Sequence, residues 1–146
     1  MIVESISNSG ADLPTPMLDA RMRVTRESAF AVTPGRSYAV YAITLHLGGM
    51  WYYIINDDDL SWPIWHPAPL FSVTDGRLPA SWKYAYHRFD SEDQIPLISF
   101  PEWADDWSFY ERLLDGDPVA LRVFEARRIE VEDLAAQGGP NLRLVP

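Results

Sequence analysis

The chain has 146 residues, of which 47% are hydrophobic, and its 12 Lys and Arg against 21 Asp and Glu give a net charge of −9. This length predicts one domain with one core, and the negative charge opposes nonspecific binding to nucleic acid or to an anionic membrane. The sequence contains no Cys, which excludes disulfides, thiolate metal sites and a cysteine nucleophile.

Membrane insertion and export are not expected from the sequence. No apolar run approaches the ~20 residues needed to cross a bilayer, and Met1 to Gly10 lacks a basic start followed by an apolar block. We therefore expect a cytoplasmic protein, most simply a bacterial one.

Residues 1–20 carry a weak pattern that is broken by Gly10, Pro14 and Pro16. They predict an irregular N-terminal arm within a single domain that spans residues 1–146. Two short strand candidates follow this arm, Arg21 to Val24 and Phe30 to Val32.

Two apolar runs, Tyr38 to Leu47 and Met50 to Ile55, meet at Gly48-Gly49 and predict a β-hairpin. A two-residue Gly48-Gly49 loop would pair Leu47 with Met50 and continue in register. The more aliphatic face, which we expect to be the core face, carries Tyr41, Ile43, Leu45, Leu47, Met50, Tyr52 and Ile54. The other face is either covered by a helix or left as an aromatic surface, and it carries Val40, Ala42, Thr44, His46, Trp51, Tyr53 and Ile55.

The first strand of this hairpin is longer than the usual strand, so we expect it to bend. A bent hairpin predicts a strongly curved antiparallel sheet or an SH3-like small barrel. Leu70 to Val73 and Trp82 to Tyr86 would add two strands, and Asp90 to Asp93 predicts a loop.

The C-terminal third predicts helices. Ser99 and Glu102 fit a capping box, and an apolar helical spacing follows until Gly116 and Pro118, with Asp105 as a competing start. The apolar residues at this spacing are Trp103, Trp107, Tyr110 and Leu114. Further along, we expect a strand over Val119 to Phe124, a short helix over Glu130 to Gln137 and a last strand over Leu142 to Val145. The predicted class is therefore α+β, with one or two C-terminal helices.

The residues that could carry chemistry do not form a known motif. A calcium loop starting at Asp57 fails, because its sixth position is Trp62 instead of Gly and its twelfth is Ala68 instead of Glu. The three histidines show no local metal spacing, and hydrolase, phosphate-loop and dinucleotide motifs are absent. We therefore expect no catalytic residue, no metal and no cofactor.

The acidic, aromatic stretch after the hairpin is the best candidate for a contact surface. Acidic side chains would steer a basic partner and rigid aromatic rings would anchor it. The candidate partner-binding residues are Asp57, Asp58, Asp59, Trp62, Trp65 and His66. The same aromatics could instead line a groove for a peptide or a sugar, or the tryptophans could simply cap the barrel.

Three segments also carry a family likeness: Tyr38 to Ile43, Trp51 to Asp58, and Pro67 to Leu78. With these aromatics and turns, the chain resembles small uncharacterised bacterial proteins of the kind thought to serve as immunity proteins against polymorphic toxins. The likeness covers roughly Arg36 to Phe124. It implies a non-enzymatic partner that binds a toxin domain and blocks its active site.

Two functions follow as hypotheses, with an enzyme as a third. The first is an acidic protein-binding or immunity protein whose partner is a basic toxin. The alternative is a small-ligand or peptide binding module that uses the aromatic loop. A deep, partly apolar cavity beside Trp51, Tyr53 and Trp65 would favour the alternative, whereas a flat acidic face there would count against it.

Overall fold

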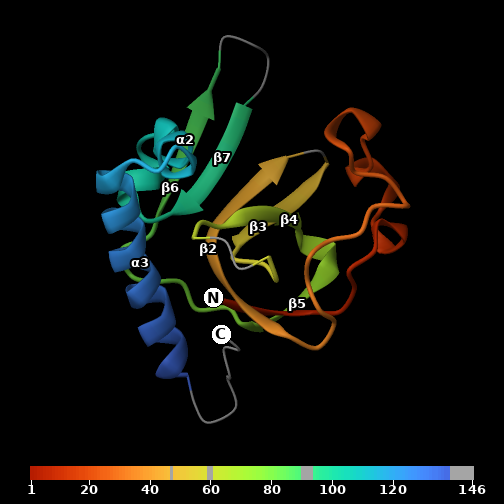
Figure 1. Cartoon of the computed structure of the whole chain (residues 1–146), viewed down its shortest axis with the longest axis horizontal. Helices are drawn as coiled ribbons and strands as arrows, with labels where there is room; N and C mark the ends of the chain where they lie inside the picture. Colours follow the sequence, from red (N-terminus) through yellow and green to blue (C-terminus); the bar gives the residue numbers. More distant parts are fainter. Residues whose placement is uncertain (47, 59–60, 90–93, 139–146) are drawn as a thin grey trace.

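The long strand β2 (Ser37–His46) organises a seven-stranded antiparallel sheet (Figure 1). The computed structural model describes residues 1–46, 48–58, 61–89 and 94–138. One edge of β2 pairs with β3 (Gly49–Ile54), which pairs in turn with β4 (Ile64–Pro67). The other edge is shared, because β1 (Ile2–Ser5) pairs with residues 37–39 and β7 (Gln94–Ser99) with residues 42–44.

A β-bulge explains how one strand serves two neighbours on the same edge. The register of β2 against β3 shifts between Val40 and Ala42, and a bulge of this kind bends a strand and increases its twist. Beyond the bulge the sheet divides, with β5 (Phe71–Asp75) next to β1 and β6 (Lys83–Arg88) next to β7. The α+β class and the curved antiparallel sheet are confirmed, and within the described residues the sheet is not closed into a barrel.

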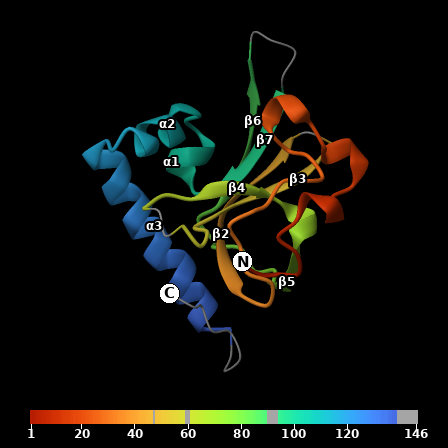
Figure 2. The ribbon, with the colours of Figure 1, turned by 45° about the vertical axis from the view of Figure 1, so that its right-hand side comes forward.

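Both faces of the sheet are covered. Helices α1 (Pro101–Ala104), α2 (Ser108–Leu114) and α3 (Pro118–Ala136) lie on one side, and the N-terminal segment lies on the other (Figures 1 and 2). That segment contains the short 3-10 helices η1 (Gly10–Asp12), η2 (Thr15–Met17) and η3 (Ala20–Met22), and η4 (Ala68–Leu70) joins β4 to β5. The hydrophobic core accordingly has two clusters, one under the helices and one under the N-terminal segment.

The predicted hairpin exists, but its turn lies one residue earlier than predicted. His46 pairs with Gly49 and Leu45 with Met50, so the chain reverses at Gly48, whose φ is 69°. Gly49 belongs to the strand, where a Cβ would come within 2.5 Å of the Met17 sulfur. A side chain at this position would therefore displace the end of the Met17 side chain. Leu47 lies outside the described residues.

The predicted core face was wrong at its outer end. Leu45 and Met50 are 49% and 41% exposed, whereas Thr44 and Trp51 on the opposite face are 3% and 2% exposed. Helices cover that opposite face, which is one of the two alternatives left open for it: the Tyr53 ring meets Trp103 of α1 edge-on at 4.8 Å.

The prediction for the N-terminal region was wrong in three places. Ile2–Ser5 of the expected irregular arm is a strand between β2 and β5, with Ile2 and Val3 fully buried. The first half of the expected strand Arg21–Val24 is instead the end of helix η3, because Asp19 caps this helix and Arg23, with a left-handed φ of 57°, follows its last residue. The residues of the expected strand 30–32 form no strand.

The C-terminal predictions were partly wrong. Ser99 ends β7 and its hydroxyl donates to the Tyr41 carbonyl, so it does not cap a helix, and the expected single helix is split into α1 and α2. The expected strand 119–124 is the start of α3, because the Asp117 carboxylate accepts from two backbone N–H groups and Pro118 occupies the first turn. The predicted helix 130–137 is the end of α3. The predicted loop 90–93 and last strand 142–145 lie outside the described residues.

Candidate functional site

A cavity of about 460 Å³ lies between the helix-covered face of the sheet and α2. Strands β2, β3, β4 and β7 supply one wall, and α2 with the chain before β4 supplies the other. The lining residues are Thr44, His46, Tyr53, Trp62, Ile64, Trp65, Ile95, Trp107, Tyr110 and Leu114. None of these described lining residues carries a formal charge when His46 is neutral. We refer to this cavity as the aromatic pocket.

Strand register and helical spacing bring the aromatic rings together. Tyr53 of β3 is the direct cross-strand partner of Trp65 of β4, and their rings stack with centroids 6.4 Å apart. On the facing wall, Trp107, Tyr110 and Leu114 follow one another at the i, i+3, i+7 spacing of one helix face. The Tyr110 ring meets Tyr53 edge-on at 5.2 Å, which joins the two walls.

The polar groups of the aromatic pocket differ in how far they are satisfied. The Tyr110 hydroxyl donates to the Pro63 carbonyl at 2.8 Å, and the Thr44 hydroxyl donates to the Pro96 carbonyl at 2.8 Å. The Tyr53 hydroxyl has no hydrogen-bond partner among the described residues. Burial raises the pKa of Tyr110 to about 12 and also raises the pKa of Tyr53, so both hydroxyls remain protonated at neutral pH.

The structure brings two of the six predicted contact residues into this pocket. Trp62 and Trp65 are half-buried and line it. The Trp65 ring is stacked by His46 at 5.3 Å and contacts Trp51 at 4.6 Å, so it is anchored in the wall. Trp62 has no such ring contact among the described residues, which leaves its indole free to meet a ligand.

Asp57 is an exposed residue whose carboxylate is held by neighbouring side chains. Its carboxylate accepts hydrogen bonds from the Thr33 hydroxyl at 2.6 Å, the Tyr38 hydroxyl at 2.7 Å and the Arg36 guanidinium at 3.0 Å. These bonds tie the end of the hairpin to the segment before β2. Asp58 is exposed, with its backbone N–H bonded to the Asn56 side chain, and Asp59 lies outside the described residues. Within the described chain, no group of three His, Asp or Glu side chains is placed to hold a metal ion.

His66 is buried in the wall of the sheet and is 3% exposed. Its Nδ1 lies 3.0 Å from the Ile64 carbonyl, its Nε2 lies 3.5 Å from the Asn56 amide nitrogen, and Phe30 and Phe71 pack around the ring. Burial lowers the pKa of His66, against the smaller raising effects of the Ile64 hydrogen bond and of the Asp58 and Asp57 charges. Because its side chain is buried, His66 packs inside the protein and does not offer a contact surface in this structure.

Acidification should therefore destabilise the protein through His66. With its folded pKa below the unfolded value of about 6.5, the imidazole binds fewer protons in the folded state, so unfolding takes up a proton as the pH falls below about 6.5. The free energy of unfolding should then drop by up to about 1.4 kcal/mol per pH unit. Urea unfolding between pH 7.5 and pH 5 would measure this slope. It should flatten in His66→Gln and persist in His46→Gln; an equal slope in both variants would contradict the assignment.

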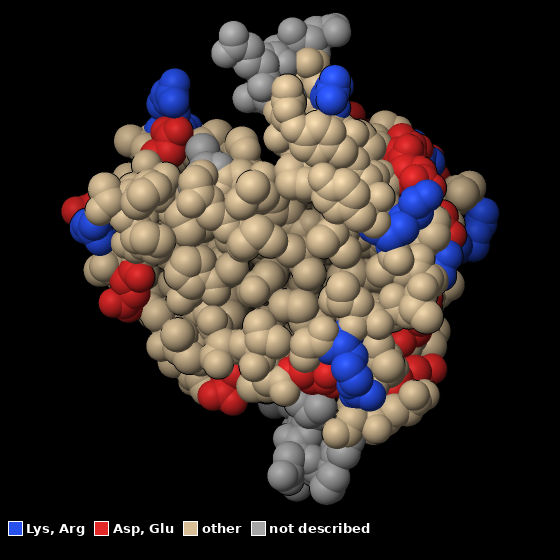
Figure 3. All heavy atoms as spheres, turned by 180° about the vertical axis from the view of Figure 1, so that it is seen from behind, with Lys and Arg blue, Asp and Glu red and all other residues tan. Residues whose placement is uncertain are grey.

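Charged side chains on the face shown in Figure 3 lie mainly around its margin. Blue and red side chains neighbour one another there, while the middle of the face is built from uncharged residues. The described part of this face therefore offers no broad acidic surface of the kind that would steer a basic partner.

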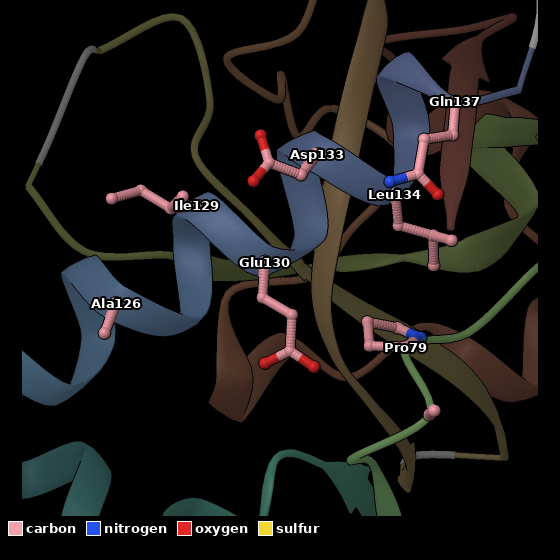
Figure 4. A pocket seen from close by; sticks show the side chains of 8 residues that line it. Pro79, Ala126, Ile129, Glu130, Asp133, Leu134 and Gln137 are labelled. Atoms are coloured by element: carbon pink, nitrogen blue, oxygen red, sulfur yellow. The ribbon is translucent and has the colours of Figure 1, made fainter.

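A second hollow lies between α3 and the segment before β6 (Figure 4). Glu130 and Leu134 extend from α3 toward the side on which Pro79 lies, and Asp133 and Gln137 complete the helix side. The Glu130 carboxylate already accepts from the Ser81 hydroxyl at 2.6 Å and from Arg127 at 2.8 Å. This hollow is more open and has no aromatic lining, so the aromatic pocket is the stronger candidate site.

Comparisons with protein-family models, with curated proteins and with solved structures find no match. Among the described residues, no helix combines the length and the apolar character needed to span a membrane.

The sequence predicted one residue of each wall of the pocket and missed the contributions of α2 and β7. Trp62 and Trp65 were candidates, and a cavity beside Trp51, Tyr53 and Trp65 was expected of a ligand-binding module. Tyr53 and Trp65 line the pocket, whereas Trp51 is not among its lining residues. The apolar helical spacing of Trp107, Tyr110 and Leu114 was visible, but such a stripe usually packs entirely into a core. Ile95 belongs to β7, a strand that the sequence did not predict.

Proposed function

We propose that the protein is a non-enzymatic binding protein whose aromatic pocket takes a small, uncharged and largely apolar ligand. The observation that carries this proposal is a cavity of about 460 Å³ lined mainly by aromatic and aliphatic side chains, with no formal charge among them when His46 is neutral. Cavities of roughly 300–1,000 Å³ with mostly hydrophobic linings are the usual sites of small molecules. Of the two functions considered from the sequence, the cavity beside Tyr53 and Trp65 favours the binding module.

The chemistry of the lining restricts the ligand. An ion buried in this pocket would find no opposite charge on the lining residues, and burying an unpaired charge is strongly unfavourable. Flat rings gain both burial and stacking from aromatic walls such as Trp65 and Tyr53. A peptide would enter this site only with an apolar or aromatic side chain, since its charged groups would have to remain outside.

An uncharged fluorescent dye tests the proposal. N-phenyl-1-naphthylamine should bind saturably with an increase in fluorescence, and Trp62→Ala should raise its Kd about tenfold, because the indole supplies part of the burial worth about 1.4 kcal/mol. Trp82→Ala is the matched control: it also removes one half-buried indole, but outside the pocket lining. Absence of saturable binding, or equal Kd values for the two variants, would sink the proposal.

Occlusion of a basic toxin by an acidic protein surface is the second proposal. It is supported by the net charge of −9, by the exposed Asp58 and by the half-buried Trp62 and Trp65, whose pocket could receive a partner's side chain. Co-purification with the product of a neighbouring gene and rescue from its toxicity would support this function. A failure of both assays with that product would rule it out.

A further inference from the structure

We propose that the Tyr53 hydroxyl is the polar anchor of the aromatic pocket, and that the ligand is an uncharged aromatic ring compound that carries a hydrogen-bond acceptor. This inference rests on the proposed binding function and specifies its ligand class. Three observations support it: the Tyr53 side chain is buried, its hydroxyl has no protein partner among the described residues, and the other hydroxyls of the lining already make hydrogen bonds to the protein.

Tyr53 is a side chain that the fold holds rigidly. It lies on β3 between its cross-strand neighbours and is 8% exposed. Its ring is fixed edge-on against Trp103 at 4.8 Å and Tyr110 at 5.2 Å, and stacked beside Trp65 at 6.4 Å. A donor on a ring held in this way is preorganised, so a ligand would lose little freedom in the protein when it binds.

The hydroxyl of this ring is the polar group that a ligand would satisfy best. Among the described residues none accepts its proton, and it is not one of the fully buried polar atoms that lack a partner, so it borders the open space of the pocket. A ligand that covered this hydroxyl without accepting from it would leave a buried, unpaired donor, which is unfavourable. The other hydroxyls of the lining are already bonded, Tyr110 to the Pro63 carbonyl and Thr44 to the Pro96 carbonyl. The raised pKa of Tyr53 keeps the group protonated, so its proton is available for a bond to an acceptor on the ligand.

The indole N–H groups of the lining are weaker candidates for this role. Trp62, Trp65 and Trp107 are half-buried, so water reaches them more readily than it reaches Tyr53. A bond from a ligand to such an indole mostly replaces a bond to water and gains little. Sugars fit the site less well than ring compounds, because the lining supplies too few free polar side chains for their many hydroxyls.

Two pairs of nearly identical molecules isolate the hydroxyl. Quinoline and naphthalene have the same bicyclic shape, but only quinoline carries an acceptor nitrogen, and it is uncharged at pH 7.5. Tyr53→Phe removes a hydroxyl without a protein partner and leaves the packed ring, whereas Tyr110→Phe removes a hydroxyl that is bonded to Pro63. Displacement of bound N-phenyl-1-naphthylamine gives the Kd of each compound for each variant. Dividing each of these four Kd values by the Kd of the same compound for the unaltered protein cancels the difference in hydration between quinoline and naphthalene.

We expect Tyr53→Phe to raise the Kd of quinoline about tenfold, because the loss of one hydrogen bond worth about 1.4 kcal/mol corresponds to that factor. The same variant should change the Kd of naphthalene less than about twofold. Tyr110→Phe should lower stability but affect the two compounds equally. If Tyr53→Phe changes both compounds equally, or neither, the anchor role is overturned while the pocket function stands. If the dye itself does not bind, the pocket function fails first, and this inference fails with it.

Discussion

Phe124→Ala should lower the free energy of unfolding by about 3–5 kcal/mol, the range for truncating a fully buried phenylalanine. Phe124 is 2% exposed on α3, and its ring meets Tyr41 of β2 edge-on at 5.3 Å. Tyr41 lies at the bulge where the sheet divides. The cavity left by the missing ring would therefore open between α3 and the point at which β2 bends, where neighbouring strands limit collapse.

Val119→Ala is the matched control, because a strand and a helix predict opposite results for it. In the strand expected from the sequence, Val119 and Phe124 would lie on opposite faces, and the face with Val119 could be the one that packs against the core. In α3 it lies in the first turn and is 53% exposed, so its truncation should change stability by less than about 0.5 kcal/mol. Chemical unfolding of Phe124→Ala and Val119→Ala distinguishes the helix from the strand. Comparable decreases in the free energy of unfolding for the two variants would contradict the helical packing.

The hairpin shows what a local pattern can predict. Alternating apolar residues around a glycine pair predicted two adjacent strands, and the structure confirms them as β2 and β3. The exact turn could not be predicted from the glycine pair alone, since Gly49 pairs with His46 as part of β3 and packs beside Met17, a residue far away in the sequence. The bulge at Tyr41 likewise lies between the residues of β2 that pair with β1 and those that pair with β7, two strands far from it in the sequence.

The C-terminal third shows how a short pattern can mislead. Residues 119–124 alternate in a way that fits a strand, but Ala120, Phe124, Val131 and Ala135 are the buried residues of α3 and recur at spacings of four and seven. The Asp117-Pro118 pair carried the local signal for a helix start, namely a side-chain acceptor followed by a residue suited to the first turn. Six residues are too few to distinguish the two periods.

The candidate site was predictable only where its residues are close together in the sequence. Trp62 and Trp65 lie in one short aromatic stretch, whereas Tyr53, Ile95 and Tyr110 reach the pocket from three separate elements. The acidic residues of that stretch were expected to face a partner. Asp57 is an exposed residue, and three donors that precede or begin β2 also converge on its carboxylate, which gives it a structural role that the sequence did not predict.

Asp57→Ala should therefore reduce the stability of the fold by about 2–3 kcal/mol. Hydrogen bonds to a charged acceptor contribute about 1.5–3 kcal/mol each when buried, but the carboxylate side chain is 24% exposed, so water would replace part of what is lost. The Tyr38 hydroxyl would lose its acceptor while it still accepts from the Thr33 backbone N–H at 2.8 Å.

Asp58→Ala separates this structural role from a surface role. Asp58 is exposed and its side chain makes no hydrogen bond among the described residues, so its truncation should change the free energy of unfolding by less than about 0.5 kcal/mol. Urea unfolding of the two variants at pH 7.5 compares them directly, since each removes one negative charge from adjacent positions. If Asp57→Ala were as stable as Asp58→Ala, the network around Arg36 and Tyr38 would not hold the hairpin end in place, and Asp57 would again be a candidate for partner contact.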